Sequence, residues 1–240
     1  MKKISRRLAI TALCFASLGA EGKAPVRTFN TAQFTGLASE SAQGYDDAAL
    51  DYELDSKDGR AIRVKHCREV ESITDDSVIE SQFPLLRLLR INCAALKKFS
   101  ESAPAERSFF PRPLVRSTVA AFPASATPYV SDNETVLRGT GTIGRHASKP
   151  KVRIIAPEVA KVIAKQDELH YVVLARADFD HDGTEDLLLR VQWSALDARG
   201  NGTDLFLLSR SSATAPVTLI WRLDTKNDNY SNAADTPSSR

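Results

Sequence analysis

The longest regular pattern of apolar residues runs from position 83 to position 100. Four inward-facing side chains recur at steps of three and four residues: Leu86, Leu89, Cys93 and Leu96. Basic residues mostly flank this stripe, so the spacing predicts an amphipathic helix that buries one face. Pro84 suits the first turn of such a helix, where its missing N–H is not needed.

A shorter alternating pattern precedes this helix and predicts a β-hairpin. Apolar and charged residues alternate on both sides of a turn at Asp58-Gly59: Leu50, Tyr52 and Leu54, then Ile62 and Val64. The strand-like run extends from Ala61 to Val70. Strict alternation would place Cys67 on the face opposite to Ile62 and Val64, so either a bulge or burial of both faces must intervene.

The last third of the chain contains apolar runs that are typical of strands. They lie at 171–175, 187–193, 205–208 and 217–223, with turn residues between them. Together with the hairpin and the helix, they predict an α+β fold. Its N-terminal part would be the hairpin plus the helix, and its C-terminal part an antiparallel β-sheet.

The segments between these parts are less regular. Residues 21–48 are small and polar and predict a flexible lead-in. Residues 103–150 mix dense prolines with aromatic residues, which predicts an ordered crossover with one short helix near 114–121. The hairpin–helix unit then occupies 49–102, and a β-rich segment with a flexible C-terminal tail occupies 151–240.

The first 20 residues have the pattern of a secretory signal peptide. Basic residues precede an apolar stretch at 8–18, and small residues allow cleavage after Gly19 or Ala20. The apolar stretch is shorter than the ~20 residues that a membrane anchor needs. Twin-arginine and lipoprotein signals fit less well, because Ala9 and Leu13 are atypical of those patterns. We therefore expect a periplasmic or secreted protein with no membrane span after cleavage.

Removal of the signal changes both the charge and the cysteine count. The full chain has 32 basic residues, 30 acidic residues and three cysteines, for a formal net charge of +2. Loss of residues 1–20 leaves 28 basic residues, 30 acidic residues and two cysteines, Cys67 and Cys93. The near-neutral balance argues against nucleic acid as a partner. In an oxidising compartment the pair predicts a disulfide, with two free buried thiols as the alternative.

A glycine-rich segment at 139–144 matches the G-x-G-x-x-G pattern of dinucleotide-binding loops. Such a loop opens a helix, whereas here a short polar run leads to Pro150. We therefore expect no nucleotide cofactor and interpret these glycines as part of a turn or a strand bend.

The segment from Asp178 to Asp186 carries the strongest candidate chemistry. Acids at alternate positions, a glycine at the sixth and an acid at the ninth bring oxygen atoms together as the chain turns at Gly183. The expected metal ligands are four carboxylates and one backbone carbonyl: Asp178, Asp180, Asp182, Thr184 through its carbonyl, and Asp186. Hard cations prefer such oxygen ligands, and the flexible loop favours Ca²⁺ over Mg²⁺. The alternative is an acidic hairpin turn without a metal, since Asp182-Gly183 alone favours a turn.

This loop resembles the calcium loop of FG-GAP and VCBS repeats, the integrin-type β-propeller blades, in which D-x-D-x-D-G-x-x-D joins two strands. An EF-hand fits less well, because position 12 is Leu189 rather than Glu and strands flank the loop. The resemblance covers residues 169–223 and implies a calcium role for the five loop residues. It does not imply a propeller, because the chain contains no second copy.

No sequence pattern points to a reaction. The four histidines fall singly, and neither H-E-x-x-H nor G-x-S-x-G occurs. We therefore expect an exported, noncatalytic calcium-binding protein that binds a protein partner, one version being an inhibitor or immunity-type protein. The alternative is a periplasmic hydrolase with a dispersed active site. A deep pocket lined by His, Asp or Ser near the sheet would favour the hydrolase, and an apolar patch the binding protein.

Overall fold

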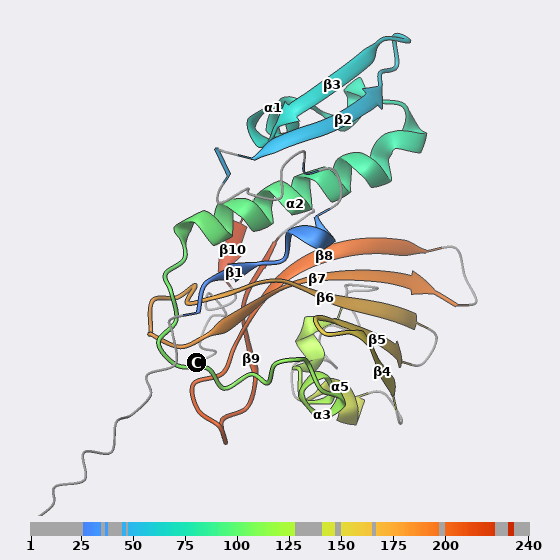
Figure 1. The fold of residues 1–240 in the computed structure, drawn as a ribbon. Coiled ribbons are helices and arrows are strands. Elements are labelled where there is room, and N and C mark those ends of the chain that lie inside the picture. The colour runs from blue at the N-terminus through green and yellow to red at the C-terminus, as the bar shows by residue number, and fades with distance from the viewer. Residues whose placement is uncertain are drawn as a thin grey trace, which may run out of the picture.

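The computed structural model describes residues 26–34, 37, 45–46, 48–127, 141–146, 150–164, 167–196, 200–223 and 230–232. These residues form the predicted α+β fold, and its elements are stacked in four layers (Figure 1). A two-stranded hairpin lies on a long helix, the helix lies on the main sheet, and short helices cover the opposite face of that sheet. The predicted signal peptide, 1–20, lies outside the described residues.

Helices dominate the first half of the described chain and strands the second. The α-helices are α1 (Cys67–Ser72), α2 (Phe83–Glu101), α3 (Arg116–Ala120) and α5 (Ile143–His146). Single 3-10 turns are η1 (Thr31–Gln33), η2 (Asp75–Ser77), η3 (Glu80–Gln82) and η4 (Ala124–Ala126). The strands are β1 (Thr28–Phe29), β2 (Ala49–Asp55), β3 (Ala61–His66), β4 (Lys151–Ala156), β5 (Val159–Ala164), β6 (Asp167–Ala177), β7 (Asp186–Ala195), β8 (Asn201–Ser209), β9 (Thr218–Leu223) and β10 (Tyr230–Asn232). Within the described residues, no helix combines the length and the apolarity that crossing a membrane requires.

The main sheet is an antiparallel meander. Its strands lie in the order β10, β9, β8, β7, β6, β5, β4, so each strand pairs with its neighbour in the sequence. Strand β1 pairs with the end of β6 that β5 does not reach, at Ala175 and Arg176. Residues 26–34 of the expected flexible lead-in are therefore part of the fold, and Phe34 is buried.

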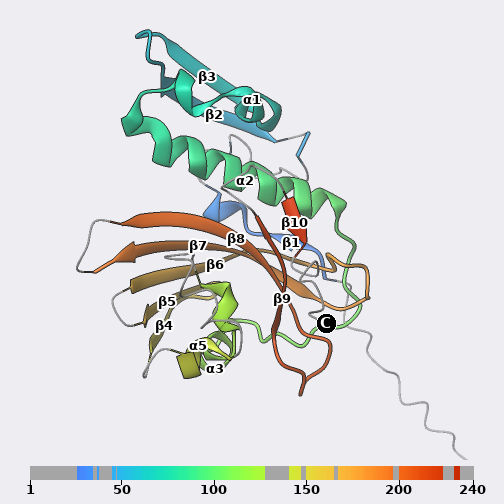
Figure 2. The same cartoon turned by 180° about the vertical axis from the view of Figure 1, so that it is seen from behind.

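The two faces of the sheet have different covers (Figure 2). On one face, the sheet packs against α2 through residues such as Leu188 and Leu207. On the other face, β-strand side chains pack against the proline-rich crossover, which contributes Phe110, Leu114 and Phe122. The crossover is thus ordered over its described part, and α3 confirms the short helix predicted near 114–121.

Helix α2 is buried on two sides rather than one. The predicted stripe faces the β2–β3 hairpin and α1, where Leu86, Leu89 and Cys93 are buried. A second set of small and aromatic residues, including Ala95 and Phe99, packs on the main sheet. The sequence predicted only one buried face, because the second face relies on small residues that do not form an obvious apolar stripe.

Cys67 begins a helix instead of continuing a strand. Strand β3 ends at His66 and α1 starts at Cys67, so the strand predicted to run to Val70 is wrong in its last four residues. The Glu69 carboxylate accepts a hydrogen bond from the N–H of His66, which stabilises the start of α1. The helical turn redirects the side chain of Cys67, and the pairing of β2 with β3 also shifts register beside it, between Ala49 and Tyr52, so one of the two expected irregularities is present.

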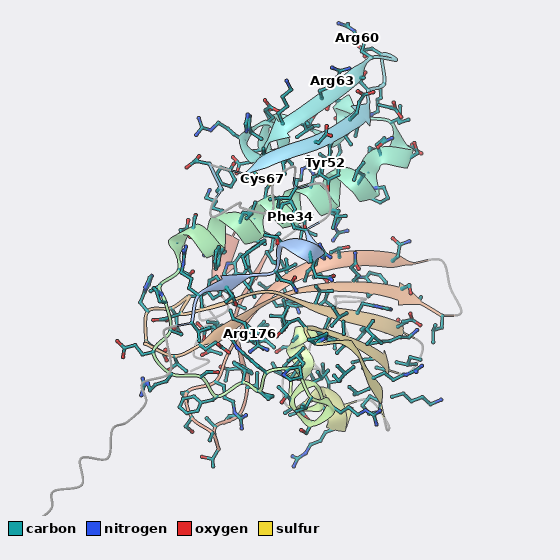
Figure 3. The ribbon with its side chains drawn as sticks, in the orientation of Figure 1. Phe34, Tyr52, Arg60, Arg63, Cys67 and Arg176 are labelled. Carbon is teal, nitrogen blue, oxygen red and sulfur yellow. A yellow bond between two sulfur atoms is a disulfide. The ribbon has the colours of Figure 1, made fainter. Side chains whose placement is uncertain are left out.

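The predicted disulfide between Cys67 and Cys93 is confirmed. It joins the first residue of α1 to the middle of α2, with the two Cα atoms 5.3 Å apart. Both cysteines are buried, and Figure 3 shows Cys67 between the hairpin and α2. The bond therefore links the outer layer to the helix that carries it.

Removal of this disulfide is expected to destabilise the protein. A cross-link over 26 positions restricts the unfolded chain by an amount worth about 3.5 kcal/mol. The double variant Cys67→Ala/Cys93→Ala should lose about 3.5 kcal/mol of unfolding free energy in urea denaturation. Wild-type protein measured with a reducing agent is the matched control. Equal stability of the oxidised and reduced wild type would contradict the prediction.

Candidate metal centre

The acidic segment forms the loop between β6 and β7. The last residue pair of this hairpin is Ala177 with Asp186, so the chain leaves the sheet at Asp178 and returns at Asp186. Strand pairing therefore brings the first and the ninth positions of the predicted metal pattern side by side.

Two residues with left-handed backbone turn the loop back toward the sheet. Gly183 has φ 79° and His181 has φ 64°. Glycine adopts this conformation at little cost, whereas a histidine does so only when the surrounding structure holds it. The N–H groups of Asp182 and Gly183 donate to the Asp178 carboxylate at 3.1 and 2.9 Å. The sharp turn predicted at Gly183 is thus confirmed, and His181 is exposed.

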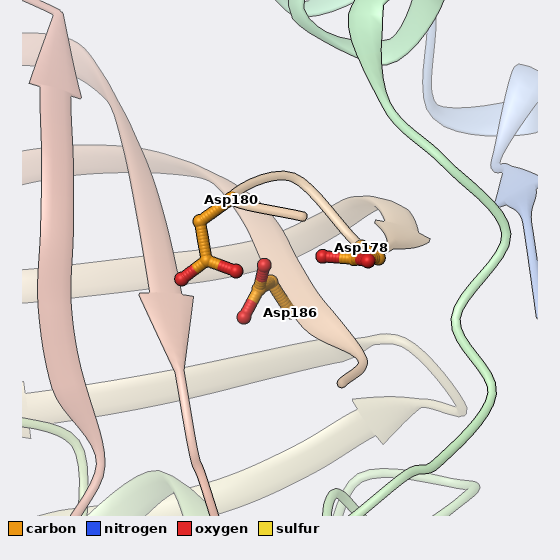
Figure 4. A group of neighbouring side chains, drawn as sticks. All are labelled: Asp178, Asp180 and Asp186. Atoms are coloured by element: carbon orange, nitrogen blue, oxygen red, sulfur yellow. The ribbon is translucent and has the colours of Figure 1, made fainter. Parts of the chain in front are cut away.

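Three of the four predicted carboxylates come together (Figure 4). One oxygen from each of Asp178, Asp180 and Asp186 lies within 4.8 Å of the others, so a single cation could contact all three. Asp178 and Asp186 are buried, whereas Asp180 is exposed. The cluster therefore has one side closed by the end of the sheet and one side open to solvent.

Asp182 and Thr184 lie differently from this group of three. Asp182 is exposed, and its Oδ1 accepts a hydrogen bond from the N–H of Thr184 at 2.6 Å. One oxygen of this carboxylate thus stabilises the turn, and Oδ2 remains for another ligand. Thr184 is buried, and the metal pattern uses its backbone carbonyl rather than its side chain.

Asp186 is the carboxylate of the site whose pKa is most strongly affected by its surroundings. Its side chain is fully buried, its Oδ2 accepts a hydrogen bond from the N–H of Phe179 at 3.0 Å, and its Oδ1 has no hydrogen-bond donor. Burial raises the pKa of Asp186 to about 7, and the charges of Asp180 and Asp182 add to the increase. Burial and the neighbouring carboxylates also raise the pKa of Asp180. A buried carboxylate such as that of Asp186 requires a proton or a cation to compensate its charge.

Ser209 supports this site although the sequence analysis did not identify it. Leu187 pairs with Leu208, which places Ser209, at the end of β8, opposite Asp186. The nearby Ser209 side chain favours the ionised form of Asp186 and lowers its pKa against the larger effect of burial. No sequence pattern marks a serine in a separate strand, because only the register of β7 and β8 brings it here.

A separate hollow of 610 Å³ lies beside α1 and includes His66, Ser72 and Asp46. These are residue types that the hydrolase alternative requires. The Ser72 hydroxyl donates to the carbonyl of Glu69 at 2.7 Å, and the Asp46 carboxylate pairs with Arg68 at 3.2 Å. These contacts do not arrange the three side chains as nucleophile, base and orienting acid.

The large apolar side chains that are exposed within the described structure are scattered over separate elements: Val115, Ile155 and Leu196. Isolated residues of this kind are normal on protein surfaces. They do not single out a docking surface.

The glycine-rich segment is helical at its described end. Residues 139–140 lie outside the described residues. Gly141 lies in a bend with φ 138° next to the isolated bridge at Thr142, as expected, whereas Gly144 lies in α5. A Cβ at this position would approach the carbonyl of Ala120 to 3.0 Å, so glycine allows α5 to pack against α3. This single helical turn is much shorter than the helix that a dinucleotide loop opens.

The raised pKa of Asp186 predicts how pH affects the metal-free protein. Because the folded form holds a proton up to about pH 7, stability should fall as pH rises from about 4 to about 7. Asp186→Asn, which keeps the shape without the charge, should show a weaker decline. Urea denaturation in calcium-free buffer between pH 4 and pH 8 measures this. Identical pH profiles for the two proteins would contradict the assignment.

Known proteins provide no relative from which to transfer a role for this site. Comparisons with protein-family models, with curated proteins and with solved structures found no match to the chain.

Proposed function

We propose that this protein is an exported, noncatalytic calcium-binding protein whose metal fixes the β6–β7 hairpin for a protein partner. One observation carries the proposal. Asp186 is fully buried with an unpartnered Oδ1, and its carboxylate lies with those of Asp178 and Asp180. Three carboxylates at this spacing repel one another unless protons or a cation intervene. A divalent cation would satisfy all three at once.

Calcium fits this set of donors better than magnesium does. All the donor atoms are oxygens, and the exposed side of the cluster, at Asp180, leaves room for further ligands. Ca²⁺ accepts about six to eight oxygen ligands in a flexible geometry, whereas Mg²⁺ requires a near-ideal octahedron. A loop between two strands can supply the first arrangement more readily than the second.

The resemblance to FG-GAP and VCBS calcium loops supports the same ligand set. In this proposal, Asp178, Asp180 and Asp186 bind the ion directly. Asp182 contributes Oδ2 while its Oδ1 keeps the hydrogen bond to the N–H of Thr184, and Thr184 contributes its carbonyl. The resemblance supports the loop alone and not a propeller, since the chain carries one such segment.

A structural role for the metal is favoured over a catalytic one. Calcium that is surrounded by carboxylates has little capacity to activate a water molecule, and the Ser72, His66 and Asp46 side chains are not arranged for catalysis. The exposed part of the loop, around His181, is the surface that a bound metal would fix for a partner. An inhibitor or immunity-type protein is one form that this function would take.

Export is supported by two independent features of the chain. Residues 1–20 have the pattern of a signal peptide, and the Cys67–Cys93 disulfide is typical of an oxidising compartment. Calcium is also abundant outside the cytoplasm, where sites of modest affinity are common. The periplasm or the exterior of the cell is therefore the proposed location.

Calcium is expected to stabilise the chelator-treated protein. At a calcium concentration 100 times the dissociation constant, binding to the folded state should add about 2.7 kcal/mol. Asp186→Asn should lose most of this gain, because it removes the central carboxylate. Asp51→Asn is the matched control, since Asp51 is an exposed aspartate of β2 far from the loop. Thermal unfolding with and without calcium measures the effect, and an unchanged wild-type melting curve would refute the metal site.

Partner binding is expected to depend on calcium. Wild-type protein used as bait in an extract of exported proteins should retain a specific partner with calcium and lose it when a chelator is added. The Asp186→Asn bait should retain little of that partner in either condition, whereas Asp51→Asn should behave as wild type. If a partner binds all three baits equally in the presence of chelator, partner binding does not depend on calcium and the prediction is wrong.

A further inference from the structure

Glu185 lies next to the central metal residue but faces the opposite side of the sheet. Asp186 is the first residue of β7 and Glu185 directly precedes it, and the two side chains point in opposite directions, as neighbouring residues of extended chain do. Asp186 faces the acidic loop, while Glu185 faces the crossover and is fully buried. A metal-binding pattern read from the sequence does not include Glu185.

Glu185 is held by three side chains, two of which belong to the crossover. Its Oε1 accepts hydrogen bonds from Ser108 Oγ at 3.0 Å and from Arg176 Nη1 at 2.8 Å. Its Oε2 pairs with the guanidinium of Arg112. Glu185 thus connects β7 to two positions of the proline-rich segment and to β6.

Arg176, which is itself buried, completes a network of balanced charge. Its guanidinium binds Glu185 on one side and Glu158, in the turn between β4 and β5, on the other at 3.0 Å. It also donates to the carbonyl of Pro111 at 3.2 Å. Figure 3 shows Arg176 on the side of the sheet that faces away from α2. Two guanidinium groups therefore neutralise two carboxylates, and the buried pair among them, Arg176 with Glu185, is where an unpaired charge would be costly.

The backbone of the crossover also forms hydrogen bonds directly with the metal loop, residues 178–186 between β6 and β7. Ala103 and Asp178 exchange two hydrogen bonds, at 2.8 and 2.9 Å. The carbonyl of Gly183 accepts from the N–H of Arg107 at 3.1 Å, and the N–H of Glu185 donates to the carbonyl of Arg107 at 2.7 Å. The guanidinium of Arg107 reaches the carbonyl of Asp182 at 3.3 Å. The turn at Gly183 is thus fixed from outside the loop.

From these contacts we propose that Glu185 is a positioning residue for the metal loop, which it anchors to residues 103–112. The loop can close around a cation only when the chain returns to β7 at the correct position, and Glu185 sets that position. Metal binding and stabilisation of residues 103–112 against local opening are then coupled. This inference rests on the proposed calcium site and identifies residues 103–112 as the segment that calcium binding would stabilise.

The coupling predicts a specific pattern of amide hydrogen exchange. At calcium 100 times the dissociation constant, amides of residues 103–112 that exchange by local opening should slow by up to about 100-fold. Glu185→Gln should bind calcium about tenfold more weakly, the lower end of the usual loss when an outer support of a metal site is removed. It should also lose most of the calcium-dependent slowing in residues 103–112.

Glu158→Gln is the matched control, because Glu158 binds the same guanidinium but lies in another turn. Its calcium affinity and its exchange pattern should stay close to wild type. If Glu185→Gln fails to fold, Ser108→Ala removes one hydrogen bond from the same carboxylate and should change both measurements in the same direction by a smaller amount. Melting temperatures in chelator confirm that the compared variants are folded.

The outcomes separate the coupling from the metal site itself. If wild type binds calcium but exchange in residues 103–112 does not respond, the coupling is wrong and the proposed function stands. If Glu185→Gln lowers stability equally with and without calcium while its calcium affinity is normal, Glu185 has only a general structural role. If wild type does not bind calcium, the proposed function fails.

Discussion

Two adjacent carboxylates are buried where β7 begins, and their charges organise the structure around them. Because side chains alternate along the strand, Glu185 and Asp186 face opposite sides of the sheet. Glu185 is neutralised by Arg176 and Arg112, whereas Asp186 faces further carboxylates and keeps one oxygen without a donor. Since a buried charge is costly unless it is compensated, the first carboxylate requires the crossover in its observed place. The second requires a proton or a cation.

The remaining layers hold this end of the sheet in place. Helix α2 packs on the sheet with one side and on the hairpin with the other, and the disulfide fixes the hairpin side through α1. Between α2 and the sheet, Arg190 donates to the side chain of Asn92 at 2.9 Å, so the middle layer also has a polar contact. The crossover continues from the end of α2 and pairs in turn with Asp178 of the acidic loop, with Val26 and with Thr184 of the same loop. The N-terminal half is thus connected to the candidate metal centre by packing and by the chain itself.

A single acidic loop in a meander differs from the repeated blades of a β-propeller. In a propeller, neighbouring blades cover the sheet faces, whereas here α2 covers one face and the crossover covers the other. The proposed metal would therefore act within one hairpin and the segment clamped to it. This arrangement suits a structural ion that fixes a surface, and it explains how one loop can contribute without further copies.

Elements whose patterns are local could be predicted from the amino-acid sequence. Periodicity and turn chemistry act over a few residues, so they predicted α2, the β2–β3 hairpin, strands β6 to β9 of the main sheet and the turn at Gly183, but not β1, β4, β5 or β10. Which distant groups meet depends on the folded arrangement of these elements. It separated Asp182 from the three converging carboxylates, placed Ser209 opposite Asp186 and surrounded Glu185 with side chains of the crossover. These contacts depend on strand register and on the path of the crossover, and neither leaves a pattern in the sequence.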